Sequence, residues 1–573
     1  MNRGKRVRVA AAQFAVGADI AANLGAVLRV SEAAAGHKPQ LLVLPEFINH
    51  LSWYDSAEHC YEVSLELDGD FLRQVADAAR AADFYLVANC TLRREKRTCS
   101  ATSLLYSPQG ELLGINDKQV LIGHENNFLQ RAGAPGPVVE TPIARLGMYA
   151  CMDGVVCETP RYLALRGAQV LCNSVNSFAP DESSLHIPVR AAENKVFVVA
   201  ANKIGPLVPA EMLDQLSAVT GIPARFLHGA GESQVVGPDG KVLAIASPDR
   251  EEVIFADIDP GAADDKRRPD GSDLFGLRRP SLYRPIAQDP ATQPAAPAKP
   301  CERLPVAMVQ LRERSPAALS PALQYIKQAV GEGAKLVVLP ELFCTDPDAR
   351  PTGADARQAQ QAVAAIAEVC GDAYVAGSFP WLGRGAELQH AALLIGRDGV
   401  RCAQPQLHVG ERHSWAAPGD EINTLDLPFA HVGLLTGEDV VYPEAFRLLA
   451  LEGVDTALVP YCAQEDWEIL TGLFERAAEN HINMVAVNGG AIPGGTFAAR
   501  LHKDFTILTP WETREFDGKL TFPPMTVAKE DAAVTHAELT PAHAANKVVS
   551  VGTDLLRGRA WALASPLVAE NAL

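Results

Sequence analysis

The feature that most constrains this sequence is an internal repeat. Four blocks occur twice in the same order, and the separation between partner blocks changes little. The pairs are VRVAAAQF with LPVAMVQL (Val7–Phe14, Leu304–Leu311), PQLLVLPEF with AKLVVLPELF (Pro39–Phe47, Ala334–Phe343), LALRGAQVL with LALEGVDTAL (Leu163–Leu171, Leu449–Leu458), and RAAENKVFVVAAN with RAAENHINMVAVN (Arg190–Asn202, Arg476–Asn488). Self-similarity of this kind identifies one structural unit used twice. The sequence is therefore a tandem duplication.

The stretch between the two copies is rich in proline and alanine. AQDPATQPAAPAKP (Ala287–Pro300) has almost no side chain that joins a core, which is typical of a semi-extended linker. The 573 residues also exceed the length of one domain, which is about 100–200 residues. The sequence predicts a first domain over 1–286, a linker over 287–302 and a second domain over 303–573.

Composition excludes several kinds of partner. The net charge of −18 disfavours binding to nucleic acid or to an anionic membrane surface. No apolar run reaches the roughly 18–20 residues of a membrane helix, and the N-terminal MNRGKRVRVAAAQF has no long apolar stretch, so we expect no secretory signal. The eleven cysteines lack paired spacing, which predicts reduced thiols and a cytoplasmic location.

Strand-like and helix-like segments alternate within each copy. Val7–Phe14 is rich in strand formers, Asn23–Gly36 has apolar residues at helical spacing, and Leu41–Leu44 is a short apolar strand. This alternation predicts an α/β fold with buried sheets. The segment from Lys203 to about His228 has no counterpart in the second copy and predicts a helix-containing excursion, which is either a lid or an inert surface insertion.

Three segments of the first copy place reactive side chains beside apolar runs. Glu46 follows a buried strand, where a carboxylate is costly unless it is paired in a salt bridge or used in chemistry. Lys118 precedes an apolar stretch, where a solvated lysine is the simpler interpretation. Cys151 lies at a strand-to-loop turn, which suits a nucleophile and equally suits a small buried side chain.

Together these segments resemble the nitrilase superfamily of carbon–nitrogen hydrolases. The order LPE, K, CxD, ALRGA and RAxEN spans essentially the whole first copy, from AAAQF to RRPSLY. The resemblance implies an αββα sandwich and a Glu–Lys–Cys triad. Glu46 would be the general base, Cys151 the nucleophile and Lys118 the oxyanion stabiliser, and Glu125 is similar to the family's second active-site glutamate. The backbone N–H of Met152 would be a second oxyanion donor. No cofactor is implied, and the sequence shows no metal-ligand cluster.

The residues after the cysteine bear on the substrate. Members that cleave nitriles usually continue with Trp-Glu, whereas Met152-Asp153 resembles the amidase and N-carbamoyl amidohydrolase branches. The arginine that carbamoylases use for a substrate carboxylate is replaced by Val155. A neutral or aromatic amide and an N-carbamoyl acid both remain open as substrates. We expect Asn173 and Asn176, in the segment Asn173–Phe178, to contact the substrate.

The second copy lacks this chemistry. Aligning the copies puts Gly437 opposite Cys151 and Gln404 or Pro405 opposite Lys118, so that only the glutamate persists, as Glu341. We expect an inactive domain that pairs with the first as an internal pseudo-dimer, with further homo-oligomerisation possible. Two alternatives stay open for it: ligand binding, or shaping of the active pocket.

Three functions follow from these observations. The first is cysteine-dependent hydrolysis of a non-peptide C–N bond through a thioester in the first copy. The second is a binding or regulatory pseudoenzyme that retains the triad as a relic. The third is amide transfer to an amine acceptor in place of water.

Overall fold

The computed structural model describes residues 6–290, 300–311, 313–347, 349–383 and 385–570. Within these ranges the chain divides into two compact units, each made of separate stretches of sequence. The first unit comprises Met1–Lys266, Asp504–Thr521 and Val548–Leu573, and the second comprises Arg267–Lys503 and Phe522–Lys547. The units thus differ from the continuous domains 1–286 and 303–573, and most of the linker predicted over 287–302 lies outside the described residues.

Two sheets form the centre of the first unit. One sheet has the order β13-β1-β2-β3-β4-β5, with β6 paired to β4, and the other has the order β12-β11-β10-β9-β8-β7. Neighbours β1, β2 and β3 are parallel, as are β8, β9 and β10, and antiparallel strands flank both groups. The strands are β1 (Val7–Gln13), β2 (Leu41–Val43), β3 (Tyr85–Arg93), β4 (Cys99–Tyr106), β5 (Leu112–Asp117), β6 (Leu129–Gln130), β7 (Val138–Glu140), β8 (Arg145–Ala150), β9 (Val170–Ser174), β10 (Phe197–Ala201), β11 (Gln234–Val236), β12 (Val242–Ile245) and β13 (Glu252–Ile258).

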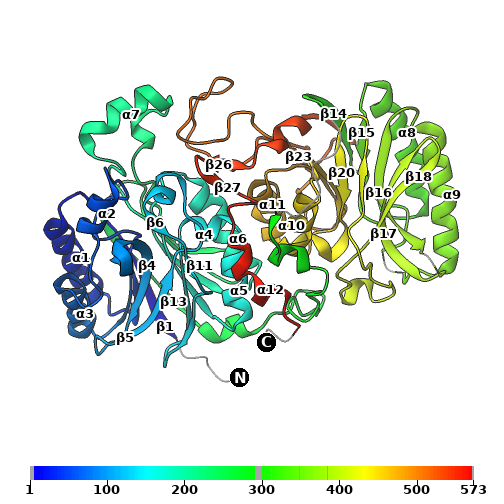
Figure 1. Ribbon diagram of the computed structural model, residues 1–573. Coiled ribbons are helices and arrows are strands. Elements are labelled where there is room, and N and C mark those ends of the chain that lie inside the picture. The colour runs from blue at the N-terminus through cyan, green and yellow to red at the C-terminus, as the bar shows by residue number, and fades with distance from the viewer. Residues whose placement is uncertain (1–5, 291–299, 312, 348, 384, 571–573) are drawn as a thin grey trace. The chain divides into compact units, whose positions relative to one another are not determined.

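Helices cover the outer face of each sheet in this unit. On the first sheet, α1 (Ile20–Ala35) and α3 (Asp70–Ala82) bury apolar side chains against the strands (Figure 1). On the second, α5 (Glu158–Leu165) and α6 (Ile187–Ala192) contact β8 to β11. The result is the predicted αββα layering. The remaining helices are α2 (Ala57–Val63), α4 (Met152–Val155), α7 (Leu213–Thr220) and α12 (Ser565–Val568), of which α7 is the helix expected in the excursion after Lys203.

The second unit repeats this strand order. Its sheets run β18-β17-β16-β15-β14-β25 and β19-β20-β21-β22-β23-β24, which match the two sheets of the first unit strand for strand. Both copies therefore have the expected α/β sandwich fold, whereas the internal pseudo-dimer stays a prediction. The elements are β14 (Leu304–Val309), α8 (Leu319–Gly331), β15 (Leu336–Val338), α9 (Gly353–Val369), β16 (Tyr374–Leu382), β17 (Leu388–Gly396), β18 (Gly399–Pro405), β19 (Thr424–Asp426), β20 (His431–Leu434), α10 (Pro443–Leu451), β21 (Thr456–Tyr461), α11 (Leu473–Asn480), β22 (Asn483–Asn488), β23 (Phe497–Ala499), β24 (Met525–Val527) and β25 (Val534–Leu539).

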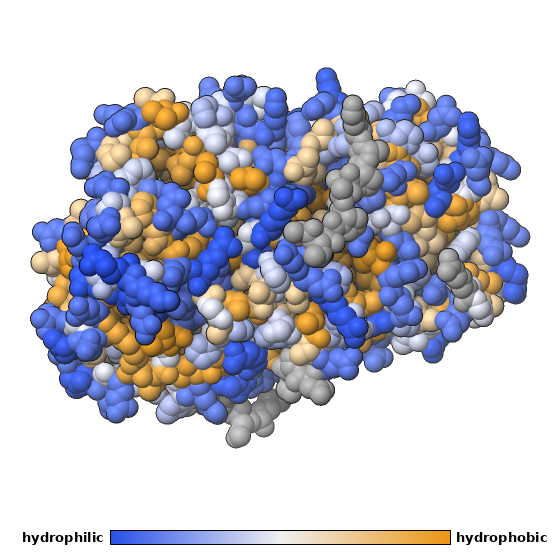
Figure 2. All heavy atoms as spheres, in the orientation of Figure 1, coloured by the Kyte–Doolittle hydropathy of each residue, from blue (hydrophilic) through white to orange (hydrophobic). Residues whose placement is uncertain are grey.

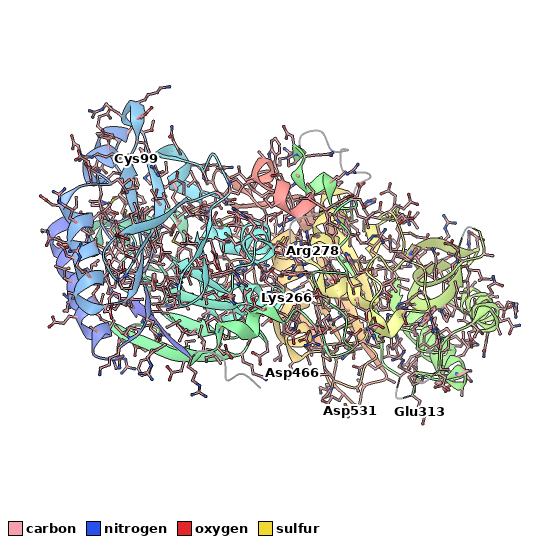
Figure 3. All side chains as sticks on the ribbon, turned by 90° about the horizontal axis from the view of Figure 1, so that it is seen from below. Cys99, Lys266, Arg278, Glu313, Asp466 and Asp531 are labelled. Carbon is pink, nitrogen blue, oxygen red and sulfur yellow. The ribbon has the colours of Figure 1, made fainter. Side chains whose placement is uncertain are left out.

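Each unit contains a segment that follows the other copy of the repeat in sequence. The hairpin of β26 (Val548–Ser550) and β27 (Thr553–Asp554) belongs to the first unit, where Thr553 Oγ1 accepts from the N–H of Gly123 at 3.0 Å. The segment that begins at Arg267 belongs to the second unit. There Arg278, labelled in Figure 3, lies 3.2 Å from a carboxylate oxygen of Glu444 on α10. Long-range packing of these segments is the reason that the units are discontinuous.

Surface and cysteine properties agree with a globular protein. The face visible in Figure 2 is mostly hydrophilic, with apolar side chains in separate patches. All eleven cysteines lie in the described residues as free thiols, as expected. No helix among the described residues is long and apolar enough to cross a membrane.

Candidate active site

Strand ends position the three predicted catalytic side chains. Glu46 follows β2 and Lys118 follows β5, both in the first sheet, whereas Cys151 follows β8 in the second sheet. Because β2, β5 and β8 belong to two facing layers, their ends bring residues that are distant in sequence to one place. All three side chains are buried.

Lys118 is held between two carboxylates. Its Nζ lies 2.8 Å from Glu46 Oε1 and 2.9 Å from Glu125 Oε2. Glu125 lies in a short helical turn, Gly123–Asn127, and its Oε2 also accepts from the N–H of Ile122 at 3.1 Å. The structure thus brings together Glu46, Lys118 and the second glutamate that the sequence predicted.

Cys151 occupies a strained turn between β8 and α4. Its φ of 45° lies in the left-handed region, where a residue with a side chain is unfavourable. The Cys151 N–H donates to Ser174 O at 3.0 Å and to Asn173 Oδ1 at 3.1 Å, which fixes the turn. Asn173 therefore contacts the backbone of the nucleophile, and its predicted contact with the substrate stays a prediction.

Asp153 ties the cysteine turn to the lysine segment. Its Oδ1 accepts from the N–H groups of Gln119 and Val120, at 3.0 and 2.8 Å, directly after Lys118. Burial raises the pKa of Asp153 to about 6, although these hydrogen bonds favour the charged form. In the sequence, Asp153 indicated only the substrate branch, whereas its contacts join the segment after Lys118 to the turn of Cys151.

A second buried lysine, missed in the sequence analysis, faces the same group. Lys203 is fully buried, and its Nζ has no hydrogen-bond partner among the described residues. Burial lowers the pKa of Lys203 to about 7, opposed mainly by the negative charge of Glu46. Comparison of the two copies could have revealed it. Lys203 immediately follows a repeated block, and the residue at the equivalent position of the second copy is Gly489, so the lysine is specific to the first copy.

The electrostatics of the site favour a neutral thiol next to a carboxylate base. Burial raises the pKa of Glu46 to about 7, against the attraction of Lys118. Burial and the charge of Glu46 hold the pKa of the Cys151 thiol well above its usual range, opposed by Lys118. Burial acts to lower the pKa of Lys118, but Glu125 and Glu46 outweigh it, so that Lys118 remains an ammonium ion. A base poised near neutral pH is suited to general acid–base catalysis.

A cavity of about 160 Å³ opens next to Cys151. Asn176 and Met152 line it, whereas Asn173 is not among its described lining residues. Most of the wall is apolar. The apolar side chains are Trp53, Ile122, Met152, Val155, Phe178, Ala179, Leu207, Val208, Leu227, Ile507, Leu508, Leu520 and Val549. The last four follow the second copy's main body in sequence but belong to the first unit, and we call them the roof residues.

The corresponding place in the second unit keeps the turn and loses the reactive groups. Gly437 has a φ of +60°, close to that of Cys151. The N–H of Gln406 donates to His390 O just as that of Lys118 donates to Ala101 O, so Gln406 is the counterpart of Lys118. The prediction of Gln404 or Pro405 was wrong, because that short segment has no unique alignment in sequence. A Cβ at Gly437 would lie 2.7 Å from Gln406 Cδ, so the lost thiol's place is filled.

A histidine takes the place of Glu125 in the second unit. His413 lies between two carboxylates, with Nε2 3.2 Å from Glu341 Oε1 and Nδ1 2.8 Å from Glu438 Oε2. Burial acts to lower the pKa of His413, but the two glutamates raise it to about 9. The second unit thus lacks the positive charge of Lys118 and has instead the positive charge of His413, at the position that corresponds to Glu125.

Comparisons with known proteins place both copies of the repeat in one family. The carbon–nitrogen hydrolase family model matches residues 8–268 and again residues 305–505. A nitrilase from Pyrococcus abyssi is 28% identical over 262 residues, which cover 46% of this chain and 92% of the relative. An omega-amidase from Danio rerio is 26% identical and an N-carbamoylputrescine amidase from Arabidopsis thaliana is 25% identical, covering 44% and 49% of this chain and 88% and 96% of the relatives.

Among solved structures, an amidase of the nitrilase superfamily from Nesterenkonia AN1 aligns with a TM-score of 0.41 and 24% identity, over 49% of this chain and 97% of that one. The two family-model matches together cover most of the sequence, one in each copy of the repeat. The chain therefore belongs to the carbon–nitrogen hydrolase family, as a tandem member of the nitrilase superfamily.

Proposed function

We propose that the first copy hydrolyses the C–N bond of a small linear amide through a thioester on Cys151. The observation that carries this proposal is the contact of Lys118 with both Glu46 and Glu125 beside a strained cysteine turn that faces a cavity. A structural salt bridge needs one carboxylate for one lysine. Here two carboxylates and two lysines converge on a thiol, which is the residue set of nucleophilic catalysis.

Acylation begins with proton transfer from the Cys151 thiol to Glu46. The sulfur then attacks the amide carbon, and the negative charge that develops on oxygen is stabilised by the Lys118 ammonium and the Met152 N–H. Glu46, now protonated, gives its proton to the amide nitrogen. The C–N bond breaks, ammonia or an amine leaves, and a thioester between the acyl carbon and Cys151 Sγ remains.

Deacylation repeats these roles with water. Glu46 accepts a proton from the water molecule, the oxygen attacks the thioester carbon, and the C–S bond breaks to give a carboxylic acid and the free thiol. Glu125 keeps Lys118 charged and in place, because burial alone would favour its neutral form. In the transfer alternative an amine attacks the thioester in place of water.

The cavity wall supports a neutral amide with an apolar acyl group. No arginine or lysine is among the described residues that line the cavity. Arg161, on the helix α5 that follows the cysteine turn, donates to Glu193 O at 2.8 Å instead. Val155 lines the wall, and Asn176 Oδ1 is buried without a donor among the described residues, so that it is available to accept from a substrate N–H. These features disfavour N-carbamoyl acids, whose carboxylate needs a cationic partner.

We further propose that the second copy has a structural role, because segments from its C-terminal half complete this cavity. Asp181 Oδ2, in the first copy, accepts from the N–H groups of Leu520 and Thr521 at 2.8 and 2.7 Å. His186 Nε2 also lies 3.0 Å from Thr521 Oγ1. These contacts attach the roof residues to the wall of the cavity.

The test is ammonia release from a panel of amides by the full chain. We expect turnover of butyramide, hexanamide and benzamide, little turnover of N-carbamoyl amino acids, and loss of all turnover in Cys151→Ala. Cys301→Ala is the matched control, since this thiol lies far from the cavity in sequence and belongs to the second unit. Unchanged hydrolysis by Cys151→Ala would overturn the proposal, and no turnover or thiol labelling at Cys151 would favour the pseudoenzyme. Product analysis with added hydroxylamine separates hydrolysis from transfer.

A further inference from the structure

The second unit contains a buried cluster of two histidines and one glutamate at the place where the first unit has its catalytic residues. Ligand atoms of Glu341, His390 and His413 all lie within 4.8 Å of one another, and all three residues are buried. Glu341 is the counterpart of Glu46 and His413 that of Glu125. His390 corresponds to Ala101 by the matched backbone hydrogen bonds of Lys118 and Gln406. The second copy has thus gained two histidines where the first has none.

The distance between two of the three ligands suits a shared metal ion. Glu341 Oε1 and His413 Nε2 are 3.2 Å apart. Two ligands that each lie about 2.0–2.1 Å from a tetrahedral or octahedral ion are roughly 3.0–3.4 Å apart. Both carboxylate oxygens of Glu341 are buried; Oε1 faces His413 and Arg412, whereas Oε2 accepts no hydrogen bond from the described residues, so the lone pairs of Oε2 are available.

Neighbouring side chains fix the orientation of both imidazole rings. His413 Nδ1 donates to Glu438 Oε2 at 2.8 Å, which leaves Nε2 facing Glu341. The amide nitrogen of Gln406 donates to Glu438 and to His408 O, so Gln406 Oε1 is the atom that accepts from His390 Nδ1 at 2.7 Å. Metal-binding histidines almost always donate their second ring N–H to such an oxygen.

The remaining groups around the cluster are compatible with a cation. Arg412 lies 3.1 Å from Glu438 and 3.5 Å from Glu341, so two carboxylates face one guanidinium, and their combined charge is negative once His413 is neutral as a metal ligand must be. His390 Nε2 faces the hydroxyls of Ser378 and Thr436 at 3.0 and 3.4 Å. The Thr436 hydroxyl donates to Pro460 O at 2.7 Å, and rotation of the Ser378 hydroxyl would release this nitrogen to a metal.

We propose that the second copy binds one Zn²⁺ ion through Glu341, His390 and His413, with Glu438 and Gln406 orienting the two rings. Two imidazoles and one carboxylate form a donor set that Zn²⁺ binds with one position left open for water or a ligand. Such an ion would lie between Glu341 and His413 Nε2. In the absence of the ion, a proton on Nε2 lies there instead. The site does not take part in the proposed reaction of the first copy.

The experiment measures metal content and affinity in the full chain carrying Cys151→Ser, which removes the reactive thiol as a competing ligand. After dialysis against a chelator and titration with ZnCl₂, we expect one equivalent of Zn²⁺ by elemental analysis. His390→Ala restores the residue of the first copy and His413→Gln removes a second ligand, and each should weaken Zn²⁺ binding by about 10-fold or more. His536→Gln, a histidine on β25 with Glu332 as partner, is the control that should bind normally.

Spectroscopy of the unmutated cluster tests the proposal even if the variants fail to fold. Co²⁺ bound in place of Zn²⁺ to the unmutated cluster should give visible absorption bands and X-ray absorption typical of nitrogen and oxygen ligands, with imidazole scattering and without sulfur. Equal Zn²⁺ binding by His390→Ala, His413→Gln and the control would overturn the proposal. So would the lack of any stoichiometric binding, in which case His413 serves as a protonated link between Glu341 and Glu438.

Discussion

The two copies show how one fold keeps its frame while its chemistry changes. Both have the same two sheets, the same strand order and the same left-handed turn at the end of the equivalent strands β8 and β20. Asp153 and Asp439 hold this turn to the neighbouring segment through equivalent backbone N–H groups. The first copy places a thiol on this frame, and the second fills the same space with Gln406 and surrounds it with buried charges.

In the second copy, the absence of the nucleophile is accompanied by repacking of the side chains around its position. A glycine at 437 alone would leave a void next to the retained Glu341. Instead the Gln406 side chain occupies the place of a Cβ, and His413 and Arg412 neutralise the carboxylates. A buried carboxylate without such partners is costly. The second site is therefore a stable arrangement of its own and more than an eroded copy.

The largest expected effect comes from giving the first copy the second copy's residue at position 118. Lys118→Gln removes the cation that stabilises the oxyanion, and kcat/KM for hexanamide should fall by about 10²–10³-fold or more. Steady-state kinetics and circular dichroism check the result. Lys195→Gln is the control, because Lys195 lies just after helix α6 and outside the cavity lining. Activity within about threefold of the wild type would remove Lys118 from the mechanism.

The reverse substitution should cost stability without creating a second active site. In the Cys151→Ala background, Gly437→Cys places a Cβ 2.7 Å from Gln406 at a φ of +60°. Strain and overpacking of this kind cost about 1–3 kcal/mol. We expect a lower Tm of the second unit's transition and no ammonia release. Turnover by this double variant, absent from Cys151→Ala alone, would show that the second frame is still competent for catalysis.

The roof residues allow a smaller effect that tests the structural role of the second copy. Leu520→Ala removes apolar surface from the cavity, and a buried CH₂ contributes about 0.8 kcal/mol to binding. KM for hexanamide should rise roughly 5–20-fold, with a smaller rise for acetamide, whose acyl group is too short to reach the roof. Leu470→Ala, at an exposed position of the second unit, is the control. Equal rises for both amides would mean that the roof does not contact the acyl group.

Sequence reasoning reached the parts of the site that local motifs carry. Glu46, Lys118 and Cys151 each follow a strand in a segment with its own pattern, and the αββα fold follows from the alternation of those patterns. The sequence did not predict the contacts that depend on long-range packing. Lys203 meets Glu46 only because β10 and β2 lie in facing sheets, and the roof residues come from sequence more than 300 positions after Cys151. The histidines of the second unit are likewise far apart in sequence, which is why no metal-ligand pattern was visible.

The smallest expected effect separates the two lysines of the first copy by pH. The reaction needs Glu46 as a carboxylate, and its pKa of about 7 predicts that kcat/KM rises with pH through neutrality. Lys203 favours the charged form of Glu46, so Lys203→Met, which removes this positive charge, should raise the pKa of Glu46 and shift the rising limb to higher pH by up to about one unit. The plateau at high pH should change little, because Lys118 still stabilises the oxyanion. Kinetics from about pH 5.5 to 9.5 measure the shift, and Lys195→Gln should leave the limb in place. A shift to lower pH would contradict this electrostatic account, and a loss at all pH values would instead give Lys203 a direct role in the transition state.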